Sequence, residues 1–286
     1  MEVAATVTSV PIFYTENIEI KMKIKDILKE IEEYAPLALQ ESYDNAGVQV
    51  GDVDQQATGV LLCLDVVENI IDEACELNCN LIISHHPVIF NPLKSLTGKS
   101  YIERCIIKAI QKGIVIYSAH TNLDNAVGGI NYKIAEKIRL QNIQILSPLK
   151  NPVSNVSGQG GAGIVGELAF SKSEQTFLHD LKDIFHLDSL KYSPLRNREV
   201  KKIAVCGGSG SFLIPDAIAS GADVFITGEA KYNDYYNVEN NILLVVIGHY
   251  ESEVCTKEIF FEIITKKFPN FAVHFSSINS NPVNYL

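Results

Sequence analysis

The chain has 286 residues, of which 47% are hydrophobic and 20% charged, a composition typical of a globular protein with one large or two modest domains. No apolar run approaches the roughly 20 residues of a membrane span, which argues against a membrane protein. The net charge of −10 argues against non-specific nucleic-acid binding, because such binding needs Lys and Arg to neutralise phosphates.

The cysteines and the N-terminus indicate a cytoplasmic protein. The six cysteines form no C-x-x-C pair and lie mostly in apolar runs, a pattern typical of buried thiols in a reducing compartment. Cys75 and Cys79 lie one helical turn apart but lack the second pair that a zinc site needs. Residues 1–21 lack the basic start and long apolar middle of a signal peptide. We expect these residues to form a tail outside the core.

The first half of the core is predicted to run over residues 22–150. Residues 23–34 have the periodicity of an amphipathic helix, and residues 41–51 indicate a loop followed by a short strand. Strands are then predicted at 60–64, 81–84 and 114–118, with helices at 67–77, 101–112 and 129–140. Strands and helices that alternate with short connections favour parallel βαβ units.

The second half is predicted to run over residues 164–286, after a linker at 151–163 that is rich in Gly, Ser and Asn. Strands are expected at 164–170, 201–206, 223–227 and 243–248, and helices at 174–185, 211–220, 229–237 and 251–267. The three strands of each predicted βαβ series correspond in order. We therefore predict an α/β protein of two related three-layer α/β halves, with a functional cleft between them.

Two adjacent histidines, His85 and His86, follow the apolar run 81–84 and precede Pro87. Consecutive side chains on a strand point to opposite faces, so both can reach one site only if the strand has ended, which Pro87 favours. Ligands of α/β sheets gather beyond the carboxyl ends of strands. A single histidine at a strand end more commonly caps or hydrogen-bonds, so the metal-site interpretation depends on partners elsewhere in the chain.

Such partners follow two other predicted strands. Asp124 lies just beyond strand 114–118, and His249 lies just beyond strand 243–248. If a helix begins near His249, Glu253 lies one turn further on the same face. The alternative for this pair is an exposed first turn in which the helix dipole favours acids.

The combined set indicates a dinuclear metal site. Three imidazoles and two carboxylates exceed what one tetrahedral zinc ion needs, and neighbouring His85 and His86 do not easily chelate one ion. Two ions with a bridging carboxylate are the pattern of hydrolytic two-metal sites. Nitrogen and oxygen ligands suit zinc, iron or manganese without choosing between them.

Other polar residues keep two interpretations each. His120 could transfer protons during hydrolysis or hold its loop by a hydrogen bond. Asp44 and Asn45 could line the cleft or form an ordinary turn, and residues 207–211 could cradle a phosphate or form a tight strand-to-helix turn. The remaining histidines, which have no partner in the pattern, are expected to be structural: His179, His186 and His274.

Several of these stretches together resemble one known family. Residues 82–87 with Phe90 and 94–96, residues 119–124, and residues 248–250 with Glu253 are similar to the signature stretches of the GTP cyclohydrolase 1 type 2 homologues, also called the Nif-three-like proteins. Residues 41–51 and 206–210 support the resemblance, which covers residue 23 to the C-terminus. Longer members carry a domain inserted between the halves, which this chain lacks.

The resemblance implies a two-lobed fold with a di-metal cleft, often assembled as a ring-shaped homohexamer. The implied metal ligands, by motif position, are His85, His86, Asp124, His249 and Glu253. The implied activity is hydrolysis of a nucleotide such as GTP with release of formate. The alternative is a metal-containing scaffold protein that binds a protein partner linked to transcription. The family's Gly-Asp and later His are Gly228, Glu229 and Asn233 in this chain, which alters the cleft wall and weakens transfer of the substrate.

Overall fold

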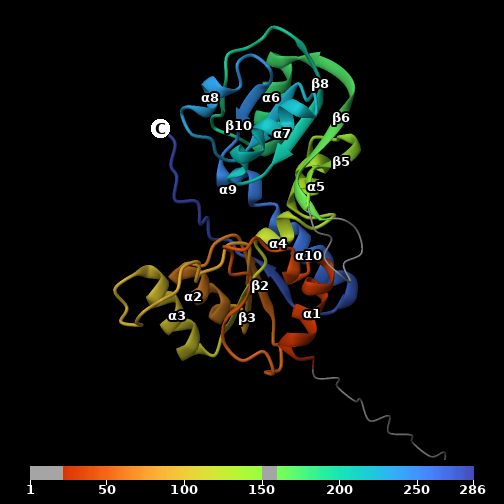
Figure 1. The fold of residues 1–286 in the computed structure, drawn as a ribbon. Coiled ribbons are helices and arrows are strands. Elements are labelled where there is room, and N and C mark those ends of the chain that lie inside the picture. Colours follow the sequence, from red (N-terminus) through yellow and green to blue (C-terminus); the bar gives the residue numbers. More distant parts are fainter. Residues whose placement is uncertain (1–21, 150–159) are drawn as a thin grey trace, which may run out of the picture.

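Two sheets, each covered by helices on both faces, organise the computed structural model, which describes residues 22–149 and 160–286 (Figure 1). The predicted tail at residues 1–21 lies outside the described residues, as does most of the predicted linker at 151–163. In Figure 1 the lobe built on the first sheet lies below the lobe built on the second. The chain is therefore an α/β protein with two lobes, as its sequence pattern predicts.

The first sheet has five strands in the order β1-β4-β3-β2-β11. β2, β3, β4 and β11 run parallel, and β1 pairs antiparallel with β4. The strands are β1 (Gly47–Val50), β2 (Val60–Cys63), β3 (Leu81–Ser84), β4 (Val115–Ser118) and β11 (Val273–Phe275). The central three strands are buried at every residue, which explains their continuous apolar runs.

Alternate residues of these strands face two different helix layers. One face packs against α1 (Ile24–Tyr34) and α10 (Thr256–Lys267), with Leu62, Ile83 and Tyr117 in that core. The other face packs against α2 (Glu68–Glu76) and α3 (Tyr101–Lys112). The period of two along each strand therefore builds a three-layer lobe.

The second sheet has six strands in the order β5-β6-β8-β9-β10-β7. β8, β9 and β10 run parallel and the other pairs are antiparallel. The strands are β5 (Gln141–Pro148), β6 (Gly161–Ser173), β7 (Lys191–Tyr192), β8 (Glu199–Cys206), β9 (Val224–Thr227) and β10 (Leu243–Val246). The predicted correspondence between the halves is confirmed, because β2, β3 and β4 are parallel neighbours in chain order in the first sheet, as β8, β9 and β10 are in the second.

Helices also cover both faces of the second sheet. α5 (Ile130–Lys137) and α6 (Glu174–Phe185) share one core with the strands, and α7 (Ile214–Ala219) shares the other. This lobe therefore has three layers too, which confirms the predicted fold class.

The predicted boundaries between the halves differ from the structure at both ends. β11 pairs with β2, and Phe260 and Ile264 of α10 pack in the core of the first lobe, although both elements were predicted to belong to the second half. β5 belongs to the second sheet, although residues 141–148 were predicted to belong to the first half. In both cases the lobe to which a strand belongs depends on which other strand it pairs with. The hydrophobic periodicity along the chain gives no information about such pairing between distant segments.

Several predicted helices are shorter or divided. The helix predicted at 211–220 is a 3-10 turn, η2 (Gly210–Leu213), followed by α7, and the one predicted at 229–237 is reduced to α8 (Asp234–Asn237). The helix expected from His249 onward is divided into α9 (His249–Glu253) and α10. Two short helical elements were not predicted, the 3-10 turn η1 (Leu37–Leu39) and α4 (Thr121–Asp124), and neither were the strands β5, β7 and β11. In the described part of the chain, no helix combines the length and apolar character needed to cross a membrane.

Candidate metal centre

The carboxyl ends of β3, β4 and β10 lead into the residues that the sequence singled out. His85 and His86 follow β3, Asp124 ends α4 just beyond β4, and His249 begins α9 just beyond β10. Parallel strands deliver their carboxyl ends to one edge of a sheet, so two such sheets facing each other bring these side chains into one site. In Figure 1, α4 and α9 lie on the sides of the lobes that face each other.

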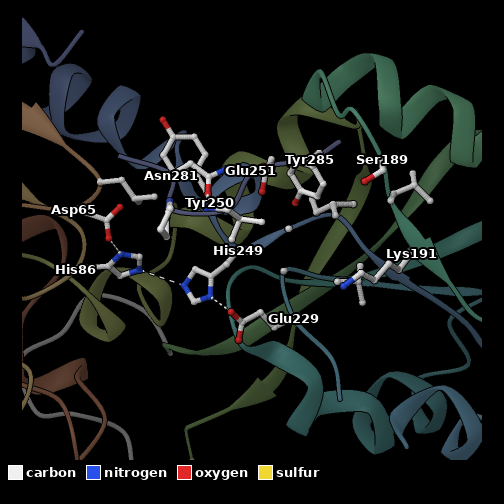
Figure 2. Close-up of a pocket in the computed structure, with 18 residues that line it drawn as sticks. Asp65, His86, Ser189, Lys191, Glu229, His249, Tyr250, Glu251, Asn281 and Tyr285 are labelled. Atoms are coloured by element: carbon white, nitrogen blue, oxygen red, sulfur yellow. Dashed lines mark hydrogen bonds and ion pairs between the residues drawn. The ribbon is translucent and has the colours of Figure 1, made fainter. Parts of the chain in front are cut away.

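Four imidazoles lie close together in this site, with their rings tilted or T-shaped to one another. Ring centroids are 5.0 Å apart for His85 and His86, 5.2 Å for His86 and His249, and 5.1 Å for His85 and His120. The Nε2 atoms of His86 and His249 are 3.3 Å apart, a pair that Figure 2 shows between the two lobes. Rings gathered this closely are typical of a metal centre.

Each of the four rings is held through its Nδ1 atom by an oxygen. Nδ1 of His85 is 2.8 Å from the carbonyl oxygen of Ala119, and each of the other three has a carboxylate as partner. The pairs are His86 with Asp65 at 2.7 Å, His120 with Asp44 at 2.8 Å, and His249 with Glu229 at 2.9 Å. Histidines that bind a metal through one ring nitrogen usually donate a hydrogen bond from the N–H group of the other. Here that bond would fix the orientation of each ring and leave Nε2 free to bind an ion.

Glu253 is the buried carboxylate at the centre of the cluster, with 3% of its surface exposed. Its Oε2 atom is 2.9 Å from Nε2 of His86 and 3.0 Å from Nε2 of His249. Its Oε1 atom is 3.8 Å from Nε2 of His85. One carboxylate therefore contacts or approaches three imidazoles, a position from which a single side chain could bridge two ions.

Two polar atoms in the site have no hydrogen-bond partner among the described residues, although both are buried. They are Nε2 of His85 and Oδ1 of Asp124, which lie 3.5 Å apart. Buried polar atoms nearly always have partners, because an unsatisfied one costs about 1–3 kcal/mol. A cation bound between these two atoms would satisfy both, so the donor set fits a metal ion.

Geometry alone groups these side chains as two overlapping triads. One triad is His85, His86 and His120, and the other is His86, His249 and Glu253. Within each triad the potential ligand atoms lie within 4.8 Å of one another. All five predicted ligands lie in the site, with Asp124 next to His85. The structure also places His120 beside them. The other histidines, His179, His186 and His274, lie in neither group, and all six cysteines are free.

Burial and neighbouring charges divide the titratable groups into two kinds. Burial lowers the pKa of His85, and burial together with the nearby Glu253 carboxylate raises the pKa of Asp124. For His86, burial opposes protonation, but Asp65 and Glu253 outweigh it and raise the pKa to about 10. For His249, burial is likewise outweighed by Glu253, and the pKa rises to about 9. Without metal, His86 and His249 are therefore protonated at neutral pH.

Metal affinity is expected to increase steeply between pH 6 and pH 8. An ion that binds Nε2 of His86 or His249 must displace a proton, and both pKa values lie above this range, so each displaced proton contributes about tenfold per pH unit. Competition with a chelator of known affinity at pH 6, 7 and 8 measures this slope. An affinity that does not change with pH would contradict the assignment of these two imidazoles as ligands.

None of the three carboxylates that hold the rings, Asp44, Asp65 and Glu229, was predicted in that role. Asp65 lies two residues beyond the end of β2, so the same strand-end rule that selects His85 also points to it. Asp44 was weighed as a residue of the cleft or of an ordinary turn, and the structure shows that it holds His120 and accepts from the Thr121 backbone. Glu229 was read only as a change in the cleft wall, but it holds His249 and accepts from Ser209.

The glycine-rich stretch after β8 forms a tight turn instead of a phosphate cradle. The backbone N–H groups of Gly207, Gly208 and Gly210 already donate to the side chains of Asn131, Ser252 and Thr227, in that order. Gly208 has φ +57°, and a Cβ atom there would collide with Oε1 of Glu253. The turn therefore lets the backbone approach the buried carboxylate closely.

Two cavities border the cluster. The first, of about 280 Å³, is the His120 cavity, whose walls include Glu41, Tyr43, Phe90, His120 and Asp124. The second, of about 320 Å³, is the Lys191 cavity, which lies against Asp65, His86, Glu229 and His249 (Figure 2). Both have His249 in their walls, so a small molecule in either would lie beside the imidazole cluster.

Comparison with known proteins assigns the chain to a family. The model of the Duf34/NIF3 (NGG1p interacting factor 3) family matches residues 22–282. The chain belongs to the Duf34/NIF3 family. This result confirms the resemblance drawn from the sequence motifs.

Curated relatives align over most of the chain. A Clostridium acetobutylicum protein named GTP cyclohydrolase 1 type 2 homolog is 35% identical over 234 residues, which are 81% of this chain and 85% of the relative. A Campylobacter jejuni protein of the same name is 33% identical over 266 residues, covering 92% of this chain and all of the relative.

Solved structures share the fold. The crystal structure of Staphylococcus aureus protein SA1388 superposes with a TM-score of 0.85 at 29% identity, covering 93% of this chain and 100% of that one. Reduced HcgD from Methanocaldococcus jannaschii superposes with a TM-score of 0.73 at 27% identity, covering 90% and 98%.

Proposed function

We propose that the protein is a metal-dependent hydrolase that holds two divalent ions, zinc, iron or manganese, between its lobes. The proposed ligands are His85, His86, Asp124, His249 and Glu253. The observation that carries the proposal is the common arrangement of the four imidazoles. Each ring is held at Nδ1 by an oxygen, and buried atoms of His85 and Asp124 lack partners in the described structure.

The chemistry that two divalent ions supply in such a site is acidification of a water molecule and stabilisation of negative charge that develops on the substrate. The residues provide position and proton transfer. Glu253, buried between the lobes, holds the imidazoles of His86 and His249 together. His120 is held at Nδ1 by Asp44, so its Nε2 atom is the one that can accept and return a proton in the His120 cavity.

The proposed substrate is a nucleotide-type molecule such as GTP. One water would add to C8 of the purine and open its imidazole ring to a formamide, and a second water would hydrolyse the formamide, releasing C8 as formate and leaving the amine. Support comes from the names of relatives that align with most of the chain, both called GTP cyclohydrolase 1 type 2 homolog. The expected result is formate release from GTP by protein reconstituted with zinc, iron or manganese. A His120→Gln variant that keeps its metal should be slower by about 100-fold or more. No formate from GTP with any of the three metals would contradict the proposed substrate.

A second function is supported by the family description, NGG1p interacting factor 3, which names a protein interaction. In that case the metal centre would be structural and the chain would serve as a scaffold. A partner that is captured equally well by wild type and His85→Ala would favour the scaffold, whereas a metal-dependent activity lost in His85→Ala with unchanged molar mass would favour the enzyme. The homohexameric ring stays a prediction, which light scattering can measure on the same samples.

A further inference from the structure

Three exposed aromatic side chains surround the His120 cavity. Tyr43 and Phe212 are 64% exposed and Phe90 is 42% exposed, and all three contribute to its wall. Tyr43 and Phe90 belong to loops of the first lobe, whereas Phe212 lies in η2 of the second lobe. The aromatic groups therefore reach the cavity from both lobes, beside the proposed metal ligands.

Their geometry leaves ring faces available to a ligand. Tyr43 and Phe90 meet edge to face with centroids 6.5 Å apart, and Phe90 meets His120 in the same way at 6.1 Å. Aromatic rings are normally buried for their large apolar area, so exposed ones that converge on a cavity mark a binding surface. Aromatic faces bind planar rings by stacking, with about 1–3 kcal/mol for each nucleic-acid base.

The polar wall of the cavity offers mainly acceptors. Asn131 already donates to the carbonyl of Asp124 and accepts from Gly207, and Asn125 donates to Leu39 and Glu41. Glu41 is half-buried, and its carboxylate has capacity for further donors beyond the one from Asn125. A ligand is therefore matched to this wall when it presents N–H groups along one edge.

The charges around the cavity do not suit a phosphate chain. Among the described residues in its wall there is no Lys or Arg. Six carboxylates surround the centre, namely Glu41, Asp44, Asp65, Asp124, Glu229 and Glu253. Their negative charge exceeds the four positive charges of two divalent ions, so little positive potential is left for a triphosphate.

We propose that the His120 cavity recognises its ligand by a planar, N–H-bearing heteroaromatic ring stacked against Tyr43, Phe90 and Phe212, with Glu41 accepting from the ring edge. The phosphate groups of a nucleotide contribute little to this recognition. This inference rests on the proposed function, in which the site binds a nucleotide-type substrate. It adds the residues that determine specificity for that substrate.

Equilibrium dialysis of guanosine, GTP and inorganic tripolyphosphate against metal-reconstituted protein tests the proposal. Guanosine and GTP should bind with dissociation constants within about tenfold of each other, and tripolyphosphate should not displace guanosine. Tyr43→Ala and Phe212→Ala should each weaken guanosine binding by roughly 5- to 150-fold, which is the loss of one stacking contact. Phe170→Ala is the control, because Phe170 is 83% exposed in β6 and does not line the cavity.

Glu41→Gln provides a second readout that a purely structural role would not produce. It should weaken guanosine but leave purine riboside, which lacks N–H groups on that edge, within about twofold of wild type. Guanosine that fails to bind, or that binds Tyr43→Ala and Phe212→Ala as it binds wild type, would overturn the proposal. Displacement by tripolyphosphate would overturn it too. Formate release measured in parallel separates the claims, because ring binding without formate contradicts the proposed hydrolysis of GTP and leaves the proposed ring recognition in place.

Discussion

Glu253→Gln is expected to weaken metal binding by more than about 100-fold and to abolish any metal-dependent activity. The carboxylate lies within 3.0 Å of Nε2 of both His86 and His249, and it is nearly completely buried. A Gln amide has the same shape but no charge, so the two imidazoles and the ions would lose their central anion. Competition with a chelator, followed by elemental analysis after dialysis, measures the loss.

Glu251→Gln is the matched control for this variant. Glu251 lies two positions earlier in α9 and accepts a hydrogen bond from Asn281, outside the imidazole cluster. It should retain the metal content of wild type. If Glu253→Gln kept its metal as tightly as Glu251→Gln does, Glu253 would not be a ligand and the two-ion arrangement would be wrong.

Glu174→Ala is expected to lower the free energy of unfolding by about 3–5 kcal/mol. Glu174 begins α6 and forms an ion pair with Arg196 at 2.9 Å, in which the two side chains are 2% and 3% exposed. Its other oxygen accepts from the backbone N–H groups of Arg196 and Asn197. The substitution would leave a buried guanidinium and two N–H groups without their acceptor. Urea unfolding, followed by circular dichroism, measures the change.

Asp180→Ala tests whether burial is the cause. Asp180 belongs to the same helix and pairs with Lys172, but the two side chains are 37% and 34% exposed. Breaking a pair with this exposure should cost less than about 1 kcal/mol. Equal losses for the two variants would show that helix composition, and not the buried pair, accounts for the effect of Glu174.

Local sequence pattern was sufficient for the two parallel trios. Five of these strands, and the last four residues of β8, are buried on both faces and therefore form short continuous apolar runs, as in β3 and β9. The pattern was not sufficient for β11, because Val273 and His274 are only partly buried and form no continuous apolar run. Only the pairing of β11 with β2 shows that this strand belongs to the first lobe. It also failed at η2, where Gly210 packs against Cys206 and Thr227 and a regular helix begins only at Ile214.

The candidate site was predictable where chain position alone brings residues together. His85, His86, Asp124 and His249 all lie just beyond the carboxyl ends of strands, which the topology places at one edge of each sheet. The residues that hold the rings were harder to predict, because the contact between His120 and Asp44 joins positions 76 residues apart in the sequence. Such contacts depend on how loops meet in space, which no local spacing encodes.

The most direct test of the metal centre is elemental analysis of untagged protein purified without chelator, with His85→Ala and His249→Ala measured beside it. We predict about two first-row metal ions per chain in the wild type and loss of metal in both variants. Wild-type protein that holds no metal, even after reconstitution with zinc, iron and manganese, would contradict it. The converging imidazoles would then be a structural network between the lobes.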